Sequence, residues 1–350
     1  MSADRSDGQG RGGLFRSLAH RLSGDTRALP DEGRLGSFDR ATGWLGTEPL
    51  TTESLRGRVV LVDFWTYTCV NWLRTLPYLR AWDAKYRDAG LTIVGVHTPE
   101  FGFEADPVNV EAHSRELGVE YPVAVDSDYG VWNEFANHYW PAVYLADAAG
   151  RIRYHHFGEG EYAMTEMAIQ QLLAEAGATD IDLDLVDVRP EGLEVAADWT
   201  SLRSPESYLG YGQSSGFASE DRALYDRAHV YEGSAGLPLN GWDLAGDWTV
   251  ARHAAVSNAP GGRIAFAFHA RDVNLVMAPS TRGRAVPFRV FLDGQPVGDA
   301  RGSDVDVDGR GVVDTAGTYQ LIRQPGPIGD RVFEIEFAEG GVDSYCFTFG

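Results

Sequence analysis

A run of seven residues, 59–65, constrains the fold more than any other part of the sequence. It reads Val-Val-Leu-Val-Asp-Phe-Trp, and a short run of β-branched and apolar residues is typical of a strand that is buried on both faces. From Val70 to Arg87 the apolar residues fall at helical spacing, and Gly90 follows where a helix C-cap is expected. The segment therefore predicts a buried strand followed directly by a helix.

The alternation of strands and helices continues to Gly177. The second strand is expected to pair in parallel with the first, whereas an Asp-Ala-Ala-Gly turn at 147–150 predicts an antiparallel hairpin near the end. Turn residues and short apolar pieces over 36–57 suggest an entry hairpin. In chain order we expect strands at 91–96 and 121–125, a helix at 108–117, hairpin strands at 142–146 and 151–157, and a closing helix with an apolar stripe at 169–176.

The second half of the chain has a different sequence pattern. After an acidic connector at 180–187 it predicts short alternating strands separated by Gly or Asp turns. A chain of 350 residues is also too long for one ordinary core. We expect an α/β domain followed by an all-β, jelly-roll-like sandwich. The predicted boundaries are a flexible leader at 1–36, the α/β domain at 37–180, a linker at 181–215 and the sandwich at 216–350.

Composition limits the partners and the compartment. The formal net charge of −21, with no basic patch in the sequence, argues against nucleic-acid binding. No apolar stretch approaches the roughly 20 residues of a membrane span, so no membrane span is expected. The leader lacks the apolar core of a secretory signal, and we therefore expect a cytoplasmic protein.

The sequence contains two cysteines, Cys69 and Cys346, too few for a disulfide scaffold. Cys69 falls where the buried strand gives way to the helix, and backbone N–H groups at a helix N-terminus favour a thiolate. The alternative is a small buried apolar residue, which is what most unpaired cysteines are. Position alone leaves both interpretations open, but Cys69 is the only plausible nucleophile.

Several motifs resemble the thioredoxin superfamily. Asp63-Phe64-Trp65 followed by Cys69 matches its strand signature, and Pro77 stands where that superfamily kinks its first helix. Trp140-Pro141 matches the superfamily's cis-proline, which lies against the active sulfur and offers backbone to a substrate chain. The resemblance implies a thioredoxin fold with a cis bond before Pro141.

A closer resemblance is to the redoxin family related to the C-terminal region of DipZ-type proteins. It is carried by 64–77, 97–101 and 138–141, and extends through 204–206 and 208–212 into the sandwich, from about residue 37 to the end. In that family the sandwich resembles a carbohydrate-binding module. The resemblance implies thiol–disulfide exchange with a thiol or disulfide protein substrate. The family's membrane-spanning electron-delivery part is not found in this sequence, so we expect a soluble thiol donor.

The motif Cys69-Val70-Asn71-Trp72 departs from the family's Cys-x-x-Cys pattern, because the second cysteine is replaced by Trp72. The usual internal disulfide cannot form, which predicts a mechanism with one nucleophilic cysteine and an external resolving thiol. We interpret Trp72 as packing in the space of the missing thiol. Asp63, in the family a proton carrier for that thiol, has either a residual proton-transfer role or a structural one.

Three further residues are candidates for supporting the thiol. Thr66 stands three residues before Cys69, the spacing with which peroxiredoxins hold a peroxide, so a thiol peroxidase of the AhpC/TSA type is an alternative function. His97 and Glu100 follow the second strand. They are candidate acid–base partners because the reactive rim of an α/β sheet lies at the C-terminal ends of its parallel strands.

The remaining candidates concern the rest of the chain. No metal site is expected, because the neighbouring His155 and His156 would point to opposite faces of a strand and one ion could hardly bind both. No cofactor is expected either. A non-catalytic protein whose sandwich binds a glycan or a protein is the rival function, with Trp199, Trp242 and Trp248 as candidate contacts. Cys346 alternates with three aromatic residues, and it can resolve Cys69 only if their Cα atoms come within about 7 Å.

Overall fold

The computed structural model describes residues 28–219, 223–234 and 236–350. The chain folds into two compact units. The first unit contains the described residues up to Trp65, with Tyr78–Thr98 and Glu111–Val188. The second unit contains Thr66–Pro77, Pro99–Val110 and Arg189–Gly350. The chain segments that surround Cys69 therefore belong to the same unit as the C-terminal half.

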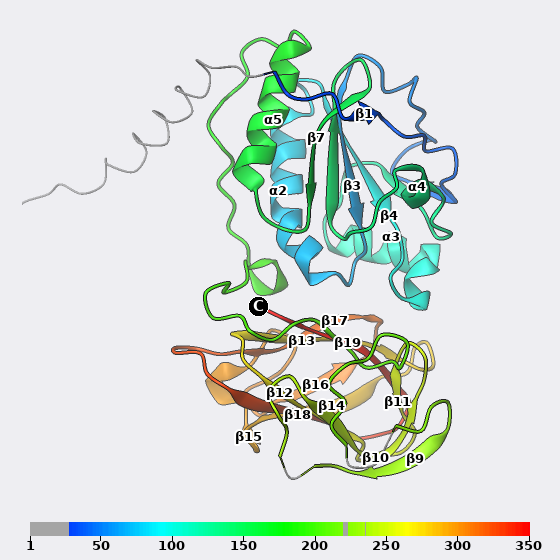
Figure 1. The fold of residues 1–350 in the computed structure, drawn as a ribbon, viewed down its shortest axis with the longest axis vertical. Coiled ribbons are helices and arrows are strands. Elements are labelled where there is room, and N and C mark those ends of the chain that lie inside the picture. Colours follow the sequence, from blue (N-terminus) through cyan, green and yellow to red (C-terminus); the bar gives the residue numbers. More distant parts are fainter. Residues whose placement is uncertain (1–27, 220–222, 235) are drawn as a thin grey trace, which may run out of the picture. The chain divides into compact units, whose positions relative to one another are not determined.

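The first unit is built on a seven-stranded sheet in the order β1-β7-β6-β3-β4-β5-β2 (Figure 1). Strand β3 pairs in parallel with β4, which pairs in parallel with β5, whereas β6 and β7 add on antiparallel. This is the α/β thioredoxin fold that the resemblance implies. The strands are β1 (Gly33–Arg34), β2 (Gly43–Leu45), β3 (Val59–Trp65), β4 (Leu91–His97), β5 (Val123–Val125), β6 (Ala142–Ala146) and β7 (Arg151–Phe157).

The part of the chain that the structure describes has four α-helices: α2 (Val70–Tyr86), α3 (Pro107–Glu116), α4 (Gly130–Glu134) and α5 (Tyr162–Glu175). All seven residues of β3 are buried, as predicted from its apolar run. The last turn of α2 is tied to α5 by the Tyr86 hydroxyl, which donates to Glu166 at 2.6 Å. Helix α4 was not predicted, because five residues are too short to show helical periodicity.

The second unit contains a large sheet of twelve strands whose pairs are antiparallel, in agreement with the predicted all-β sandwich. Its apolar core gathers side chains from most of these strands, among them Phe333, Ile335 and Phe337 at alternate positions of β18. The strands are β8 (Ser207–Tyr208), β9 (Ala228–Glu232), β10 (Trp242–Val250), β11 (Ala255–Ser257), β12 (Arg263–Phe268), β13 (Asp272–Pro279), β14 (Val286–Leu292), β15 (Gln295–Pro296), β16 (Arg310–Val313), β17 (Gly317–Arg323), β18 (Arg331–Phe337) and β19 (Val342–Phe349).

Two of the predicted boundaries need correction. The entry hairpin over 36–57 does not form, because β2 pairs with β5, about eighty residues further along, and not with a neighbouring strand. The linker over 181–215 contains β8, which pairs with β19, and Leu209 is buried in the core of the second unit. A strand of two residues carries no alternation, so the sequence could not reveal it.

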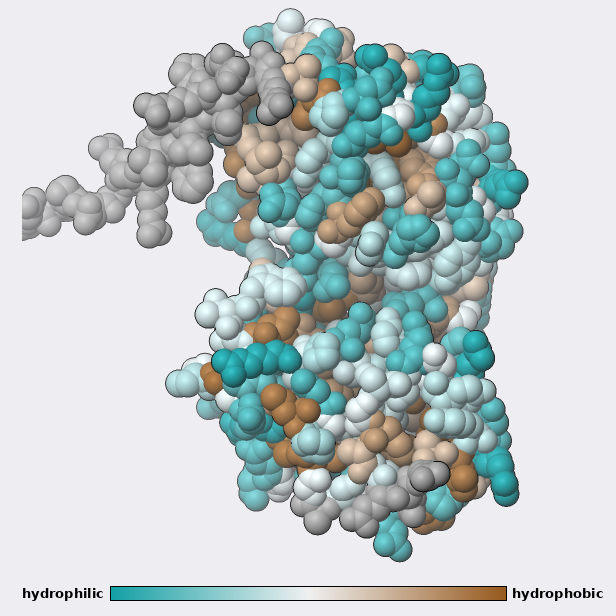
Figure 2. Space-filling model, viewed as in Figure 1, coloured by the Kyte–Doolittle hydropathy of each residue, from teal (hydrophilic) through white to brown (hydrophobic). Residues whose placement is uncertain are grey.

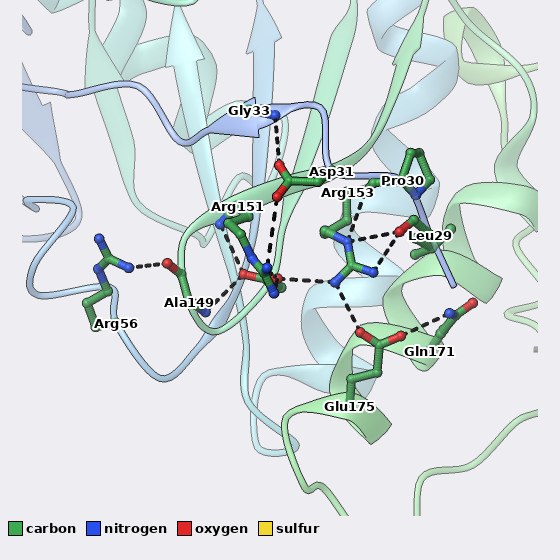
Figure 3. Close-up of polar contacts among 11 residues, drawn as sticks. Leu29, Pro30, Asp31, Gly33, Arg56, Ala149, Arg151, Arg153, Gln171 and Glu175 are labelled. Carbon is green, nitrogen blue, oxygen red and sulfur yellow. Dashed lines mark hydrogen bonds and ion pairs between the residues drawn. The ribbon is translucent and has the colours of Figure 1, made fainter. Parts of the chain in front are cut away.

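The predicted leader also ends too late. Residues 1–27 lie outside the described part, but β1 pairs with β7 as an edge strand of the first sheet. Figure 3 shows Arg153 of β7 donating to the carbonyl oxygens of Leu29 and Pro30 and to the carboxylate of Glu175. Arg153 also donates to the carboxylate of Asp147 at 3.2 Å. Long-range pairing to an arginine therefore orders a segment whose own sequence looks like a flexible tail.

Replacing Arg153 by methionine is expected to lower the free energy of unfolding by about 2 kcal/mol. The side chain is 10% exposed, and its loss leaves two carbonyl groups and part of a buried carboxylate without donors. The cost stays moderate because Arg151 still pairs with Asp147 at 2.9 Å. Urea unfolding of Arg153→Met measures it, with the half-exposed Arg151→Met as the matched control. A loss no larger than that of the control would contradict this role for Arg153.

The surface shown in Figure 2 is mostly hydrophilic or neutral, and its hydrophobic side chains lie in small scattered groups. Scattered apolar side chains of this kind are normal on a folded protein. Within the described residues, no helix has the length and apolar character that crossing a membrane requires.

Candidate active site

Cys69 immediately precedes α2, which begins at Val70. The backbone N–H groups of Asn71 and Trp72, in the first turn, donate to its sulfur. The Cys69 residue as a whole is partly buried. Position at a helix N-terminus, as predicted, thus gives Cys69 two backbone donors.

The surroundings of Cys69 nevertheless oppose ionisation. Burial raises the pKa of the Cys69 thiol well above its usual value, and the carboxylates of Glu100 and Glu206 raise it further. The two backbone donors act in the other direction but do not compensate. The resting form of Cys69 is therefore the thiol, because desolvation and two acidic neighbours outweigh the helix N-terminus.

Glu104 is a buried carboxylate that holds the loop before Cys69 in place. Its Oε1 accepts the Thr68 hydroxyl at 2.6 Å and the Thr68 N–H at 3.3 Å. Its Oε2 accepts the N–H groups of Glu100 and Phe101 at 2.7 and 2.8 Å. One side chain thus joins two loops of the site. Glu104 was not predicted as a site residue, because a single acidic residue in a loop gives no recognisable sequence pattern.

Thr66 takes part in the same arrangement. Its hydroxyl is hydrogen-bonded to Glu104, and this bond lowers the pKa of the carboxyl while burial, the larger effect, raises it. The hydroxyl that a peroxidase would use to hold a peroxide therefore binds a buried carboxylate. The structure places Thr66 beside Glu104 as a loop-fixing residue.

Glu100 lies in a second group of polar side chains that includes residues from the C-terminal half. The Tyr208 hydroxyl donates to Glu100, and Glu206 Oε1 lies 3.8 Å from Cys346 Sγ. Burial raises the pKa of Glu100 to about 8, and the charge of Glu206 adds to the shift. Glu206 and Tyr208 were quoted only as part of the family motifs, and that resemblance was the signal that they belong to the site.

His97 ends β4 in the first unit and is fully buried. Its ring stands edge-on to the Trp65 ring, with centroids 4.8 Å apart. Burial lowers the pKa of His97 to about 3, so the imidazole is neutral at physiological pH. It cannot supply the positive charge that would acidify a thiol.

Asp63 also lies in the first unit, fully buried in the middle of β3 between Gly95 and Val143 on the neighbouring strands. The Asp63 carboxylate acts on the hydroxyl of Tyr121. Burial raises the pKa of that hydroxyl, and the charge of Asp63 raises it further. Complete burial is what both the structural and the proton-transfer interpretation of Asp63 require, and both stay predictions.

The remaining predicted residues pack as the resemblance implies. The Trp140–Pro141 peptide bond is cis. The Trp140 indole donates to the carbonyl of Thr98 at 3.1 Å and packs on Trp132. Trp72 is fully buried, as expected of a packing residue. Cys69, Thr66, Trp72 and Glu100 thus fall in the second unit, and Asp63, His97, Trp140 and Pro141 in the first.

The three tryptophans that were candidate ligand contacts differ in burial. Trp242 and Trp248 are buried in the core of the second unit, so they cannot bind a sugar. Trp199 is 63% exposed. Two of the three candidate contacts, Trp242 and Trp248, are therefore core residues, because a sheet core of this size requires large apolar side chains.

The described residues contain no group of three or more His, Cys, Asp or Glu side chains placed to hold a metal ion. His155 hydrogen-bonds to Glu32 at 2.7 Å, and His156 to the carbonyl of Glu159 at 3.4 Å.

Two family models match this chain. Residues 40–155 match the AhpC/TSA family, and residues 204–350 match the thioredoxin-like C-terminal domain. Thiol-disulfide oxidoreductase YkuV of Bacillus subtilis is 32% identical over 133 residues, which make up 38% of this chain and 88% of YkuV. The chain belongs to the thioredoxin-like redoxins, a family of thiol–disulfide oxidoreductases.

This redoxin is also similar to DipZ of Mycobacterium tuberculosis, with 37% identity over 261 residues. That match takes in 73% of the redoxin and 36% of DipZ, so the chain spans about a third of the length of that relative. A solved thioredoxin-like protein in its oxidised form is 30% identical and aligns over 41% of the redoxin and 96% of its own chain, with a TM-score of 0.38.

Proposed function

We propose that this redoxin exchanges disulfides through Cys69 as its single nucleophile. The sulfur attacks a disulfide of a protein substrate, a mixed disulfide forms, and one substrate thiol leaves. The observation that carries the proposal is a partly buried cysteine whose sulfur receives two backbone N–H groups at the start of α2. The same N–H groups stabilise negative charge on the sulfur as the proton leaves.

The proton has a plausible acceptor nearby. A thiol with a raised pKa must lose its proton before it attacks, and a base works best when its pKa is near the operating pH. The pKa of Glu100, about 8, meets this condition, and its charge acts on Cys69. We assign Glu100 the role of exchanging a proton with the Cys69 thiol.

Trp72 determines which thiol can resolve the mixed disulfide at Cys69. A buried indole stands where a second cysteine would resolve the mixed disulfide, so another thiol has to attack Cys69. A soluble external thiol donor is sufficient for this step, and the substrate class is a protein disulfide or thiol.

The test is the reduction of insulin disulfides in the presence of dithiothreitol. Wild-type redoxin is expected to accelerate precipitation of the reduced insulin chain. In Cys69→Ser the protein-dependent rate is expected to be at least about a thousandfold lower, because the nucleophile is gone. Circular dichroism shows whether the variant is folded. Equal rates for wild type and Cys69→Ser would overturn the proposal.

The same samples separate this activity from a thiol peroxidase. Because the Thr66 hydroxyl binds Glu104, hydrogen peroxide is expected to oxidise Cys69 slowly, with little trapping of sulfenic acid by dimedone. Rapid peroxide consumption that depends on Cys69, with slow disulfide exchange, would establish the peroxidase instead.

A further inference from the structure

Four side chains form a row across neighbouring strands of the second unit. Val276 of β13 lies opposite Thr318 of β17 on one side and Cys346 of β19 on the other. Cys346 in turn lies opposite Tyr208 of β8. Residues that are directly opposite on paired strands point to the same face of a sheet, so these four side chains share one face. We call them the cross-strand row.

The cross-strand row faces away from the apolar core of the second unit. The core instead contains Leu275 and Phe347, which neighbour Val276 and Cys346 along their strands and point to the other face. Cys346 is 1% exposed, so something else covers it. That cover includes Phe101, which packs in one cluster with Val276 and Cys346. Cys346 is therefore buried beneath the loop that carries Glu100.

Both ends of the cross-strand row are fastened to the site around Cys69. At one end the Thr318 hydroxyl donates to the carbonyl of Thr68, the residue before Cys69, at 2.7 Å. At the other end the Tyr208 hydroxyl donates to Glu100. Strands in a sheet are about 5 Å apart, so Cys346 lies about 10 Å along the row from Thr318. The loop that carries Cys69 is therefore hydrogen-bonded to one end of the cross-strand row, and Cys346 is a member of that row.

The electrostatic surroundings of the two thiols agree with this placement. Burial raises the pKa of Cys346, as it does that of Cys69, and the charges of Glu206 and Glu100 act on both sulfurs. Charges interact more strongly the closer they lie, so two carboxylates that act on both thiols agree with the placement given by the cross-strand row. The Cys346 thiol has two acceptors within reach, the Phe347 carbonyl oxygen at 3.4 Å and Glu206 Oε1 at 3.8 Å.

We infer that Cys346 is the resolving thiol of this redoxin, in place of the external thiol. This inference rests on the proposed function, because it needs the mixed disulfide at Cys69. The Cys346 thiol gives its proton to the Glu206 carboxylate and attacks Cys69 Sγ. A Cys69–Cys346 bond forms, the bond from Cys69 to the substrate breaks, and the second substrate thiolate leaves. The substrate disulfide gains two electrons, the cysteine pair loses two, and a dithiol reductant later restores the pair.

The experiment treats fully reduced protein with the aromatic disulfide DTNB, whose released thiolate is coloured, and follows it by intact mass. Wild type is expected to release two thiolates per chain, to keep no adduct and to lose two hydrogens. Cys346→Ala is expected to release one thiolate and to keep one adduct at Cys69. Ser344→Ala, two residues away on β19, is the matched control for disturbing the strand and should behave as wild type. Non-reducing digestion of oxidised wild type should yield one peptide pair that joins Cys69 to Cys346, a result that needs no variant.

Two different results would overturn different claims. If wild type keeps the adduct at Cys69 as Cys346→Ala does, or if an adduct appears separately on each cysteine, Cys346 is not the resolving thiol although Cys69 still reacts. If wild type and Cys346→Ala react no faster than Cys69→Ser, the proposed function itself fails.

Discussion

Replacing Glu104 by glutamine is expected to lower the free energy of unfolding by about 3–5 kcal/mol, although the side chains have almost the same shape. Both carboxylate oxygens accept two hydrogen bonds each from the Thr68 and Glu100–Phe101 segments. An amide offers one oxygen and one NH2 group, so one pair of donors would face another donor. Buried donors that lose their acceptor cost about 1–3 kcal/mol each.

Chemical denaturation of the full chain measures this loss. The matched control is Glu111→Gln on α3, where an exposed carboxylate makes only a surface ion pair with Arg115 and the expected cost is below about 0.5 kcal/mol. The Glu104→Gln variant should also react faster with iodoacetamide at Cys69, because the loop that ends at Thr68 is released. A change in stability as small as that of Glu111→Gln would show that Glu104 does not hold the two loops.

Replacing Glu100 by glutamine is expected to raise the thiolate fraction of Cys69 at alkaline pH and to leave it unchanged at acidic pH. Glu100 has a pKa of about 8, so in wild type it is neutral below that pH and negative above it. The Cys69 thiolate, whose pKa is already raised by burial, forms in the range where Glu100 repels it. Glutamine stays neutral throughout, so the pKa of Cys69 falls and the thiolate fraction rises above about pH 8.

The rate of iodoacetamide alkylation against pH measures this effect, in a Cys346→Ala background so that only Cys69 is counted. At about pH 9 we expect Glu100→Gln to react about threefold to tenfold faster than its parent, and at about pH 6 to react at the same rate. Glu111→Gln should match the parent at both. A ratio that is the same at both pH values would mean that access to Cys69, and not the charge of Glu100, had changed.

Together these residues suggest how a redoxin can work without the usual second cysteine. Desolvation keeps Cys69 protonated at rest, and Glu100 and Glu206 are placed to exchange protons as the sulfurs change partners. In this scheme each thiol loses its proton to a neighbouring carboxylate only when it reacts. The predicted consequence is a thiol that reacts slowly with simple alkylating reagents near neutral pH but exchanges with a disulfide that is bound beside Glu100.

Local patterns in the sequence were sufficient for most of the first unit. The buried run that becomes β3 and the spacing that becomes α2 are properties of neighbouring residues, and both elements were predicted within one residue of their observed ends. The motif resemblance added the cis bond before Pro141. Prediction failed where pairing is distant, as for β1 with β7 and β8 with β19.

The site divides in the same way. The sequence alone determined that Cys69 stands at a helix N-terminus and that Trp72 removes the local resolving thiol, because both follow from neighbours along the chain. Only the tertiary structure decided the protonation of Cys69 and the position of Cys346. A pKa depends on the water excluded and on the charges brought close, and here those charges come from Glu100 and from Glu206, far apart in the sequence. Likewise, the direction of the Cys346 side chain is fixed by strand register across β8, β19, β13 and β17, which no local pattern of residues can specify.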